Sequence, residues 1–287
     1  MDDGVRTIRT TDMGVDQMGF DVAGKTVLVT GASSGIGAAL AEALAAAGAT
    51  VGICARRQDR LAEVLARCKA HSPGSRSWVV DVADPAALEQ LAADAVAELG
   101  GVDVLVNNAG IPLRKHVTRL DDEAVQRSMV VNYLAPVRLT LALLPHLLTR
   151  PEARIVNVSS VAATLSSPGE AAYDASKAAL SAFSEAMAID LWDTSVGVLV
   201  VYPGLVATEL FDVPGNDPVA ADIDPISTDE LVAGVLDALA RDASQVYVPG
   251  WFADVVAGKA GNLEGFLAGA AEYVRGRESP PAASDPA

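Results

Sequence analysis

Two side chains that can exchange protons, Tyr173 and Lys177, stand four residues apart in an alanine-rich stretch that begins at Glu170. The stretch predicts a helix, and residues four apart lie on one face of a helix. A phenol has an unperturbed pKa of about 10, and a neighbouring ammonium group favours the phenolate and lowers that value. Such a pair can pass a proton to a substrate oxygen near neutral pH. The same spacing is also common in surface pairs that have no chemical role.

Ser159 and Ser160 come directly after residues 154–158, an apolar stretch that predicts a buried strand. A hydroxyl at the carboxyl end of a strand could hold a substrate oxygen and the charge that develops on it. Either serine could instead cap a turn. Residues 196–202 predict another buried strand, after which Pro203-Gly204 turn the chain.

Three glycines, Gly31, Gly35 and Gly37, separate a strand expected at 26–30 from a helix expected from Ala38 onward. A tight turn at this point brings backbone N–H groups and a helix N-terminus together, which makes an anion site. The spacing is G-x-x-x-G-x-G rather than the G-x-G-x-x-G of most dinucleotide folds, and a glycine trio alone can be no more than a turn. With a strand before it and a helix after it, the turn predicts nucleotide binding.

Two arginines, Arg56 and Arg57, follow a second strand expected at 50–55. In dinucleotide folds the residue closing this strand reads the adenosine ribose, where a carboxylate binds the 2′-hydroxyl and an arginine accommodates a 2′-phosphate. Ala55 stands at the acidic position, and Arg56 offers a planar fork of donors suited to phosphate. Arg56 therefore favours NADP(H) over NAD as the coenzyme, unless both arginines merely begin a solvated helix.

Further strands are expected at 77–82 and 102–106, the second of which leads directly into Asn107–Gly110. Asp81, near the end of the first, could accept a hydrogen bond from an adenine amino group or cap the next turn. Four strand–helix units in succession predict an α/β fold, a doubly wound parallel sheet with helices on both faces. Ligands of such sheets bind at the carboxyl ends of the strands, where these motifs converge.

The composition favours a single globular domain: the chain has 287 residues, of which 51% are hydrophobic. A net charge of −16 without a basic run argues against nucleic acid as a partner. Cys54 and Cys68, the two cysteines, form no Cys/His cluster, so we expect reduced thiols and no metal site. Without an apolar run of about 18 residues or a signal-peptide core, we expect no membrane span and a cytoplasmic location.

The chain divides into three parts by composition. Residues 1–21 are polar and are expected to form a flexible arm, and residues 22–250 form the catalytic domain. Within this domain, residues 209–227 are rich in Pro, Gly, Asp and Asn and predict a substrate lid. Residues 251–287 form an extension, whose apolar side chains could cover the substrate pocket, pack on another subunit or touch a membrane surface. Its last residues, from Ser279, are expected to be disordered.

Taken together, these motifs resemble the short-chain dehydrogenase/reductase family over about residues 24–210. The family carries T-G-x-x-x-G-x-G, here Thr30–Gly37, and N-N-A-G, here Asn107–Gly110. It also carries an Asn on the following long helix, a Ser after strand five, Y-x-x-x-K, and P-G followed by a Thr. The matching residues are Asn132, Ser160, Tyr173, Lys177, Pro203, Gly204 and Thr208. The resemblance implies a Rossmann-type fold and NAD(P)-dependent oxidoreduction of carbonyls and alcohols.

The resemblance also implies roles for individual residues. Tyr173 would be the general acid/base, and Lys177 would lower its pKa and bind the nicotinamide ribose. Ser160, chosen over Ser159 by its spacing to Tyr173, would hold the substrate oxygen, and Asn132 would position a water that links Lys177 to solvent. The coenzyme would be held by Gly31, Ser33, Ser34, Gly35, Ile36, Gly37, Arg56, Asp81, Val82, Asn108, Ala109, Gly110, Tyr173, Lys177, Pro203, Gly204, Val206 and Thr208.

The sequence therefore predicts an NADP(H)-dependent reductase or dehydrogenase that acts on a ketone or secondary alcohol, with a mainly apolar small molecule as substrate. Family members pair two helices into dimers and tetramers, so we expect a homodimer or homotetramer through residues 122–149 and 171–192. The alternative is a regulatory protein that binds NADP without turnover. Such proteins usually lose the Tyr or the Lys, and this chain keeps both.

Overall fold

A computed structural model describes residues 19–219 and 222–278. Seven strands form one sheet in the order β3-β2-β1-β4-β5-β6-β7, and every neighbouring pair is parallel. The order reverses between β1 and β4, which confirms the predicted doubly wound α/β fold. The strands are β1 (Thr26–Thr30), β2 (Thr50–Ala55), β3 (Arg76–Val79), β4 (Val104–Asn107), β5 (Ala153–Val158), β6 (Val196–Pro203) and β7 (Gln245–Val248).

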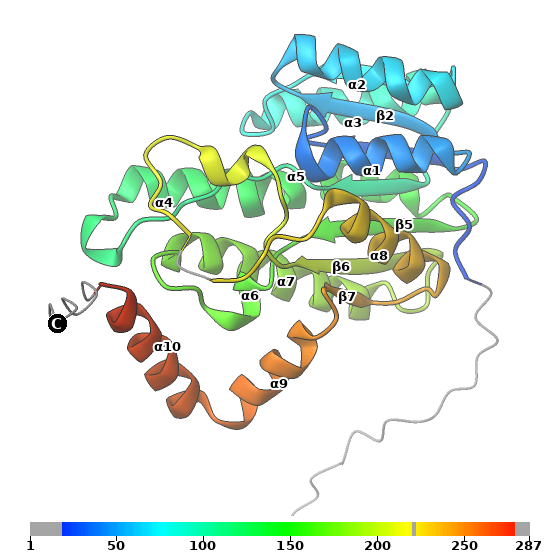
Figure 1. Cartoon of the computed structure of the whole chain (residues 1–287). Helices are drawn as coiled ribbons and strands as arrows, with labels where there is room; N and C mark the ends of the chain where they lie inside the picture. Colours follow the sequence, from blue (N-terminus) through cyan, green and yellow to red (C-terminus); the bar gives the residue numbers. More distant parts are fainter. Residues whose placement is uncertain (1–18, 220–221, 279–287) are drawn as a thin grey trace, which may run out of the picture.

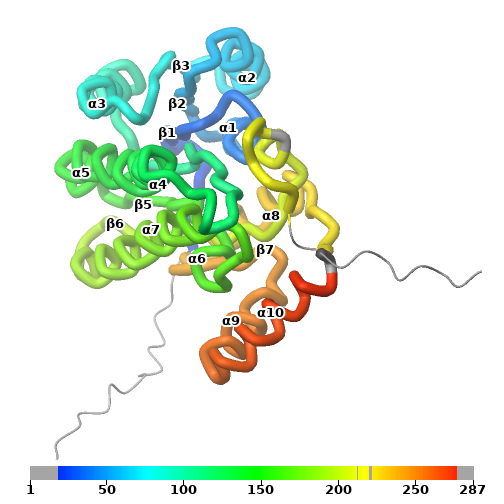
Figure 2. The backbone as a smooth tube through the Cα atoms, turned by 90° about the vertical axis from the view of Figure 1, so that its left-hand side faces the viewer, coloured from blue at the N-terminus to red at the C-terminus, as the bar shows by residue number. Residues whose placement is uncertain are grey.

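Helices cover both faces of this sheet (Figure 1). One face packs against α1 (Gly35–Ala46), α2 (Gln58–His71) and α8 (Thr228–Ala240). The other packs against α3 (Pro85–Leu99), α5 (Ala135–Leu147) and α7 (Ala171–Asp190), as Figure 2 shows along the strands. Successive strand residues point to opposite faces, so Val27 and Val29 belong to the first core and Leu28 to the second.

Local sequence signals explain several helix ends. Asp84 caps α3 by accepting a hydrogen bond from the Ala86 N–H at 2.9 Å, and Pro85 holds the first helical position. Gly100 ends the same helix in the left-handed region at φ 75°. Ser227 caps α8 through the Glu230 N–H at 3.1 Å. Asp84 and Ser227 therefore fix helix starts beside the carboxyl edge of the sheet, whereas Gly100 ends α3 at the opposite edge, before β4.

The long helix predicted at 122–149 contains a wider turn. The helix α4 (Asp122–Met129) passes through the π-helical segment η2 (Val130–Leu134) into α5. The combined helix, Asp122–Leu147, is long and apolar enough to span a bilayer by length and composition, with a mean hydropathy of 1.3, contrary to the expectation from sequence. Its α5 part contributes Leu139 and Leu143 to the core beneath the sheet, so this helix has the packing of a core helix.

The described part of the expected N-terminal arm, residues 19–21, is packed rather than free. Phe20 is 2% exposed, and its N–H donates to the Leu239 carbonyl at 3.3 Å. The guanidinium of Arg154 lies 4.6 Å from the centre of the Phe20 ring. Because this large apolar ring is buried, the flexible arm predicted for residues 1–21 does not include Phe20. Residues 1–18 lie outside the described chain.

The C-terminal extension forms two helices, α9 (Phe252–Gly261) and α10 (Leu263–Glu278). The helix α9 lies beside α6 (Ala162–Leu165), and α10 packs against α9 (Figure 1). Lys259 of α9 donates to the Thr164 carbonyl at 2.6 Å and to the Ser166 hydroxyl at 3.0 Å. Phe252 is 5% exposed and packs against Gly204. The structure therefore places the start of the extension against the carboxyl edge of the sheet. This position agrees with the alternative in which the extension covers the substrate pocket. The predicted disorder from Ser279 lies outside the described residues.

Candidate active site

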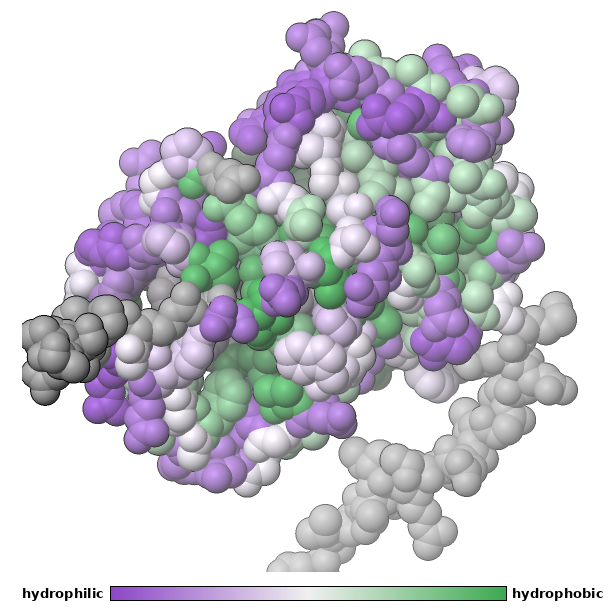
Figure 3. Space-filling model, viewed as in Figure 1, coloured by the Kyte–Doolittle hydropathy of each residue, from purple (hydrophilic) through white to green (hydrophobic). Residues whose placement is uncertain are grey.

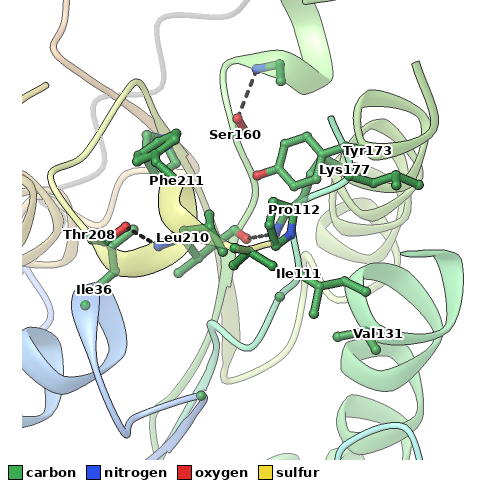
Figure 4. Close-up of a pocket in the computed structure, with 18 of the residues that line it drawn as sticks. Ile36, Ile111, Pro112, Val131, Ser160, Tyr173, Lys177, Thr208, Leu210 and Phe211 are labelled. Carbon is green, nitrogen blue, oxygen red and sulfur yellow. Dashed lines mark hydrogen bonds between the residues drawn. The ribbon is translucent and has the colours of Figure 1, made fainter. Parts of the chain in front are cut away.

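One cavity of about 870 Å³ runs along the carboxyl ends of the strands, from the glycine turn to α10. All of the site residues predicted from the sequence line it except Asn132 and Val206. Figure 3 shows apolar side chains gathered on this face between the lid segment and α9. Figure 4 shows the centre of the cavity, where Ser160 and Tyr173 face Leu210 and Phe211. The cavity thus has a polar end near the glycine turn and an apolar end near the C-terminal helices.

The glycine turn has no room for side chains. A Cβ on Gly37 would lie 2.4 Å from the Asn108 amide nitrogen, and one on Gly31 would lie 2.7 Å from the Ala109 Cα. Gly31 and Gly35 also have φ values of 68° and 54°, which side chains disfavour. Backbone without side chains therefore lines the cavity at the start of α1. A pyrophosphate could approach the N–H groups of this helix N-terminus closely.

The Asn107–Gly110 turn is bonded to the glycine turn across the sheet. Thr30 Oγ1 accepts hydrogen bonds from the backbone N–H groups of Asn108 and Ala109, both at 3.0 Å. The Asn108 amide donates to the Thr30 carbonyl at 2.9 Å. These bonds hold β1 and β4 together at the point where the strand order reverses, so the floor of the cavity is rigid.

Both arginines after β2 line the cavity, but Arg57 makes the specific contacts. Its guanidinium donates from Nε and Nη2 to the Ser33 hydroxyl, each at 3.2 Å, and from Nη2 to the Ser34 hydroxyl. It also pairs with Glu209 of the lid at 2.9 Å. The sequence indicated Arg56 as the phosphate residue, with the start of a solvated helix as the alternative for both arginines. The structure adds Arg57 because the turn before α2 directs it back onto the glycine turn.

The structure shows the turn-capping alternative for Asp81, and its contact with adenine stays a prediction. Its Oδ1 accepts from the Ala83 N–H at 3.0 Å, so the side chain caps a turn. The residue also lines the cavity beside Val82. The strand β3 ends at Val79, earlier than expected, so Asp81 lies on the loop beyond it.

Tyr173 and Lys177 lie together on α7, as the spacing predicted, and both line the cavity. Burial raises the pKa of the Tyr173 hydroxyl, and the nearby Glu170 raises it further, while a hydrogen bond with Ser160 opposes the shift. This differs from the expectation that Lys177 would lower this pKa. In the protein alone, burial of the phenol outweighs the groups that lower its pKa, which are Ser160 and, to a smaller extent, Arg114.

Lys177 is 4% exposed, and its ammonium group donates to the Val158 carbonyl at 2.8 Å. It lies 6.0 Å from the centre of the Tyr173 ring. Burial lowers the pKa of Lys177 to about 8, because the charged form loses its hydration. A lysine with this pKa can change its protonation state near neutral pH.

The two serines after β5 have different surroundings. The Ser159 hydroxyl is buried against α7, where it donates to the Lys177 carbonyl at 3.1 Å and pairs with the Ser181 hydroxyl at 2.8 Å. The Ser160 hydroxyl accepts from the Ala162 N–H at 3.1 Å and faces the Tyr173 hydroxyl (Figure 4). Of the two hydroxyls, that of Ser160 is therefore placed to meet a substrate oxygen.

Asn132 lies behind the cavity wall, with no exposed surface. It belongs to the π-helical segment η2, and its Oδ1 accepts from the Ile111 N–H at 2.8 Å. Its amide donates to the Ile111 carbonyl and to the Ser176 hydroxyl, both at 3.0 Å. A Cβ on Gly110 would lie 3.3 Å from Asn132 Oδ1 and 3.5 Å from the Lys177 ammonium. Asn132 and Lys177 therefore approach the same small region behind Gly110.

Val206 does not line the cavity, contrary to its predicted coenzyme contact. It is 2% exposed, belongs to the core and pairs with Ile226 at the base of the lid. Thr208, two residues on, does line the cavity.

Two charged residues near Tyr173 were missed by the sequence analysis. Arg114 is 4% exposed and follows the Asn107–Gly110 turn, and Glu170 precedes α7. Burial raises the pKa of Glu170, and Arg114 opposes the shift. Neither residue belongs to a motif, so only the fold reveals that both line the substrate end of the cavity.

Arg114 is bonded to the segment that the sequence predicts to be a lid. Its Nε donates to the Asp217 carbonyl at 2.9 Å, and its Nη2 donates to the Phe211 carbonyl at 2.8 Å. Its backbone N–H donates to Asn216 Oδ1, and its guanidinium lies 5.4 Å from the Phe211 ring centre. At its base, the lid is closed by the bond from the Ile226 N–H to the Leu205 carbonyl at 2.8 Å. Positions 220 and 221 of the expected lid are not described.

Apolar side chains line the end of the cavity that lies opposite the glycine turn. They come from the loop before α4, from α6, from the lid and from the C-terminal helices. These residues are Ile111, Pro112, Leu113, Leu165, Leu210, Phe211, Val213, Val219, Ile223, Phe252, Ala270 and Tyr273. Within residues 19–219 and 222–278, no group of three or more His, Cys, Asp or Glu side chains could hold a metal ion.

Comparison with known proteins identifies the family. A family model for short chain dehydrogenases matches residues 25–217. A fatty acyl-CoA reductase from Acinetobacter baylyi is 38% identical over 192 residues, which cover 66% of this chain and 65% of that protein. The chain spans between 58% and 65% of the length of the first three curated relatives. The chain belongs to the short-chain dehydrogenase family, a family of oxidoreductases.

Solved structures agree with the fold. A short-chain dehydrogenase/reductase from Burkholderia phymatum, in complex with NAD, superposes with a TM-score of 0.78 at 24% identity and covers 85% of this chain and 96% of its own. An alcohol dehydrogenase from Thermococcus sibiricus, complexed with 5-hydroxy-NADP, gives a TM-score of 0.69 at 26% identity and covers 78% and 95%. The same fold therefore occurs in a protein that holds NAD and in one that holds a hydroxylated NADP.

Proposed function

We propose that this protein is an NADP(H)-dependent oxidoreductase that interconverts a ketone and a secondary alcohol. The observation that carries the proposal is the position of Ser160, Tyr173 and Lys177 at the middle of one cavity. On one side the cavity leads to the glycine turn, and on the other it leads to an apolar end. A dinucleotide and a substrate placed in the two ends would meet beside the Tyr173 hydroxyl.

Each polar residue at this point has a distinct role in the proposal. Tyr173 gives a proton to the carbonyl oxygen or takes one from the alcohol. Ser160 donates a hydrogen bond to the same oxygen and stabilises the charge that develops there. Lys177 supplies a positive charge next to the phenol and binds the nicotinamide ribose, while Asn132 connects the region behind Gly110 to a water relay. The bound coenzyme supplies or accepts the hydride.

The choice of NADP(H) rests on the charges after β2. Arg56 and Arg57 line the adenosine end of the cavity, and Ala55 stands where an NAD site has a carboxylate. Arg57 already bonds to two hydroxyls of the glycine turn, so a 2′-phosphate there would meet a fixed guanidinium. NAD remains the less favoured coenzyme.

The proposed substrate is mainly apolar near its carbonyl group. Leu210, Phe211 and Phe252 line that end of the cavity, as does Tyr273 of α10. The Acinetobacter baylyi relative is named for action on fatty acyl-CoA, whose acyl chain has the same apolar character. A ketone or secondary alcohol that carries a long alkyl chain is therefore the first substrate class to test.

We also propose a homodimer or homotetramer located in the cytoplasm. Support for assembly comes from Leu141 of α5 and from Ile189 and Trp192 at the end of α7, which are 56%, 74% and 70% exposed. Exposed apolar side chains on two neighbouring helices are typical of a subunit interface. Cell fractionation would test the proposed location.

The test of the central proposal is Tyr173→Phe, which removes only the hydroxyl. We expect NADPH affinity within about two-fold of the wild type and turnover lower by at least about 10²-fold, the usual contribution of a general acid. Ser159→Ala is the matched control, because its hydroxyl faces α7 rather than the substrate. Undiminished turnover in Tyr173→Phe with intact NADPH binding would refute the role of Tyr173 as general acid/base. Absence of turnover in the wild type would favour the alternative of a regulatory protein that binds NADP.

A further inference from the structure

The lid places a carboxylate in the adenosine end of the cavity. Glu209 is the first residue of η3 (Glu209–Asp212), a short 3-10 helix that begins the lid. Its Oε2 accepts from Arg57 at 2.9 Å, and its Oε1 accepts from Arg60 of α2. Glu209 and Arg57 both line the cavity. One carboxylate of the chain therefore occupies two guanidinium groups next to the glycine turn.

The geometry points to Glu209 as a residue that sets coenzyme selectivity. Its carboxylate occupies an anion site formed by Arg57 and Arg60, and the 2′-phosphate of NADP(H) would bind at the same site. This inference rests on the proposed function for the position of the coenzyme, and it adds a competing anion to the coenzyme site. In this view the protein binds NADP(H) only after Glu209 leaves the arginines. NAD(H), which carries a hydroxyl at the same position, makes no such demand.

The charges explain why the two anions compete. Arg57 is already committed to the Ser33 and Ser34 hydroxyls, so its guanidinium is held at the edge of the glycine turn. A phosphate that reaches Arg57 would come within contact distance of a carboxylate on the same donors, and like charges at that distance repel. A carboxylate can instead accept a hydrogen bond from a ribose 2′-hydroxyl, as the acidic residue of NAD sites does.

The same displacement reaches the substrate end of the cavity. Thr208 caps η3 through the Leu210 N–H at 3.4 Å, and its methyl group lies 3.1 Å from a Cβ built on Gly35. The two residues that follow Glu209, Leu210 and Phe211, line the apolar end of the cavity. Release of Glu209 from Arg57 and Arg60 removes two of the contacts that hold η3, and η3 also carries these two side chains. Binding of the 2′-phosphate is therefore coupled to the lid.

The experiment compares dissociation constants of NADPH and NADH for the wild type and for Glu209→Gln, by coenzyme fluorescence without substrate. Glu209→Gln keeps the shape of the side chain and removes its charge. We expect the ratio Kd(NADH)/Kd(NADPH) to rise about five-fold, the upper range for exposed ion pairs, with most of the change in NADPH. The dissociation constant of adenosine 2′-monophosphate should change in Glu209→Gln as that of NADPH does, and that of adenosine 5′-monophosphate should change as that of NADH does.

The matched control is Asp237→Asn on α8. Like Glu209→Gln, it removes one negative charge, here from an exposed ion pair with Arg241. It should leave both dissociation constants unchanged. Hydrogen exchange at residues 208–213 gives a second readout: NADPH should speed exchange there in the wild type, and NADH should not. An unchanged or lower ratio in Glu209→Gln would overturn the inference. The wild-type ratio tests the proposed NADP(H) preference separately, since a value below one would refute that preference whatever the variant does.

Discussion

The ammonium group of Lys177 donates a hydrogen bond to the Val158 carbonyl at 2.8 Å, and this bond joins the helix α7 to the carboxyl end of β5. Val158 is followed by the serines of the candidate site, so one contact fixes the lysine relative to both Ser160 and Tyr173. The position is nearly dry, because Lys177 is 4% exposed. The hydrogen bond therefore determines where the positive charge lies, and burial determines how easily it is lost.

We predict that the reaction in the direction of carbonyl reduction weakens above pH 8. Burial lowers the pKa of Lys177 to about 8, so its positive charge is present below that pH and lost above it. A plot of kcat/KM for the coenzyme against pH, which reports the free enzyme, should fall by about ten-fold per pH unit on its alkaline side. Lys177→Arg should move this fall to higher pH, since a guanidinium stays charged. An identical alkaline limb in the variant would assign the ionisation to another group.

We predict that Arg114→Gln lowers kcat/KM for the carbonyl substrate by about ten-fold or more and leaves coenzyme affinity unchanged. The variant loses charged hydrogen bonds to the Phe211 and Asp217 carbonyls, and such bonds contribute about 1.5–3 kcal/mol each. The lid then no longer holds Phe211 against the substrate. Steady-state kinetics, together with hydrogen exchange at residues 211–217, would measure both effects.

Arg119→Gln is the control for this prediction. Arg119 also contacts Asp217, through its side chain, but it is exposed and does not line the cavity. We expect kcat/KM within about two-fold of the wild type, as for most exposed ion pairs. An equal loss in both variants would mean that Arg114 acts only through general stability of the lid, and the free energies of unfolding would then fall together.

We predict that Asp174→Asn stabilises the protein at pH 8 but not at pH 4. Burial, with a contribution from Glu170, raises the pKa of Asp174 from 3.8 to about 7. The folded protein therefore holds this proton more tightly than the unfolded chain, so stability from this group is present below pH 3.8 and is lost as the pH rises through 7. The uncharged amide avoids that loss, so the free energy of unfolding of Asp174→Asn at pH 8 should exceed that of the wild type by about 2 kcal/mol after allowance for solvent screening.

Chemical denaturation at pH 4, 6 and 8 would measure this effect. The environment of Asp174 includes the Ser167 N–H, which donates to it at 2.6 Å, and the charges of Glu170 and Lys259. Asp190→Asn, at the exposed end of the same helix, is the control and should show no gain that grows with pH. A constant difference between wild type and Asp174→Asn at all three values would contradict the prediction.

We predict that Trp192→Arg lowers the oligomeric state. Trp192 is 70% exposed and follows α7, beside Ile189. A charged side chain at this position would lose its hydration in a subunit interface, which costs more than an exposed substitution. Size-exclusion chromatography with light scattering would give the mass of each species. Leu267→Arg on α10, also an exposed apolar side chain, should keep the wild-type mass, and an unaltered mass in Trp192→Arg would place the interface elsewhere.

The sequence by itself determined the order of the strands and helices and most of the candidate site. Buried parallel strands give continuous apolar runs such as 26–30, and the glycine turn, Asn107–Gly110, Tyr173 and Lys177 have fixed spacings along the chain. Local geometry is enough for these features: a helix places Tyr173 and Lys177 on one face, and a tight turn needs glycine. The family match is read from the same local spacings.

The tertiary structure decided what depends on contacts between distant segments. Arg114 and Glu170, 56 positions apart and outside any motif, meet only because the loop after β4 and the start of α7 lie on one edge of the sheet. Arg57 meets Glu209 for the same reason, across 152 positions. The direction of the Tyr173 pKa shift also depends on burial, which is a property of the packed protein. Spacing along a chain carries no information about desolvation or about which charged groups from separate elements share one cavity.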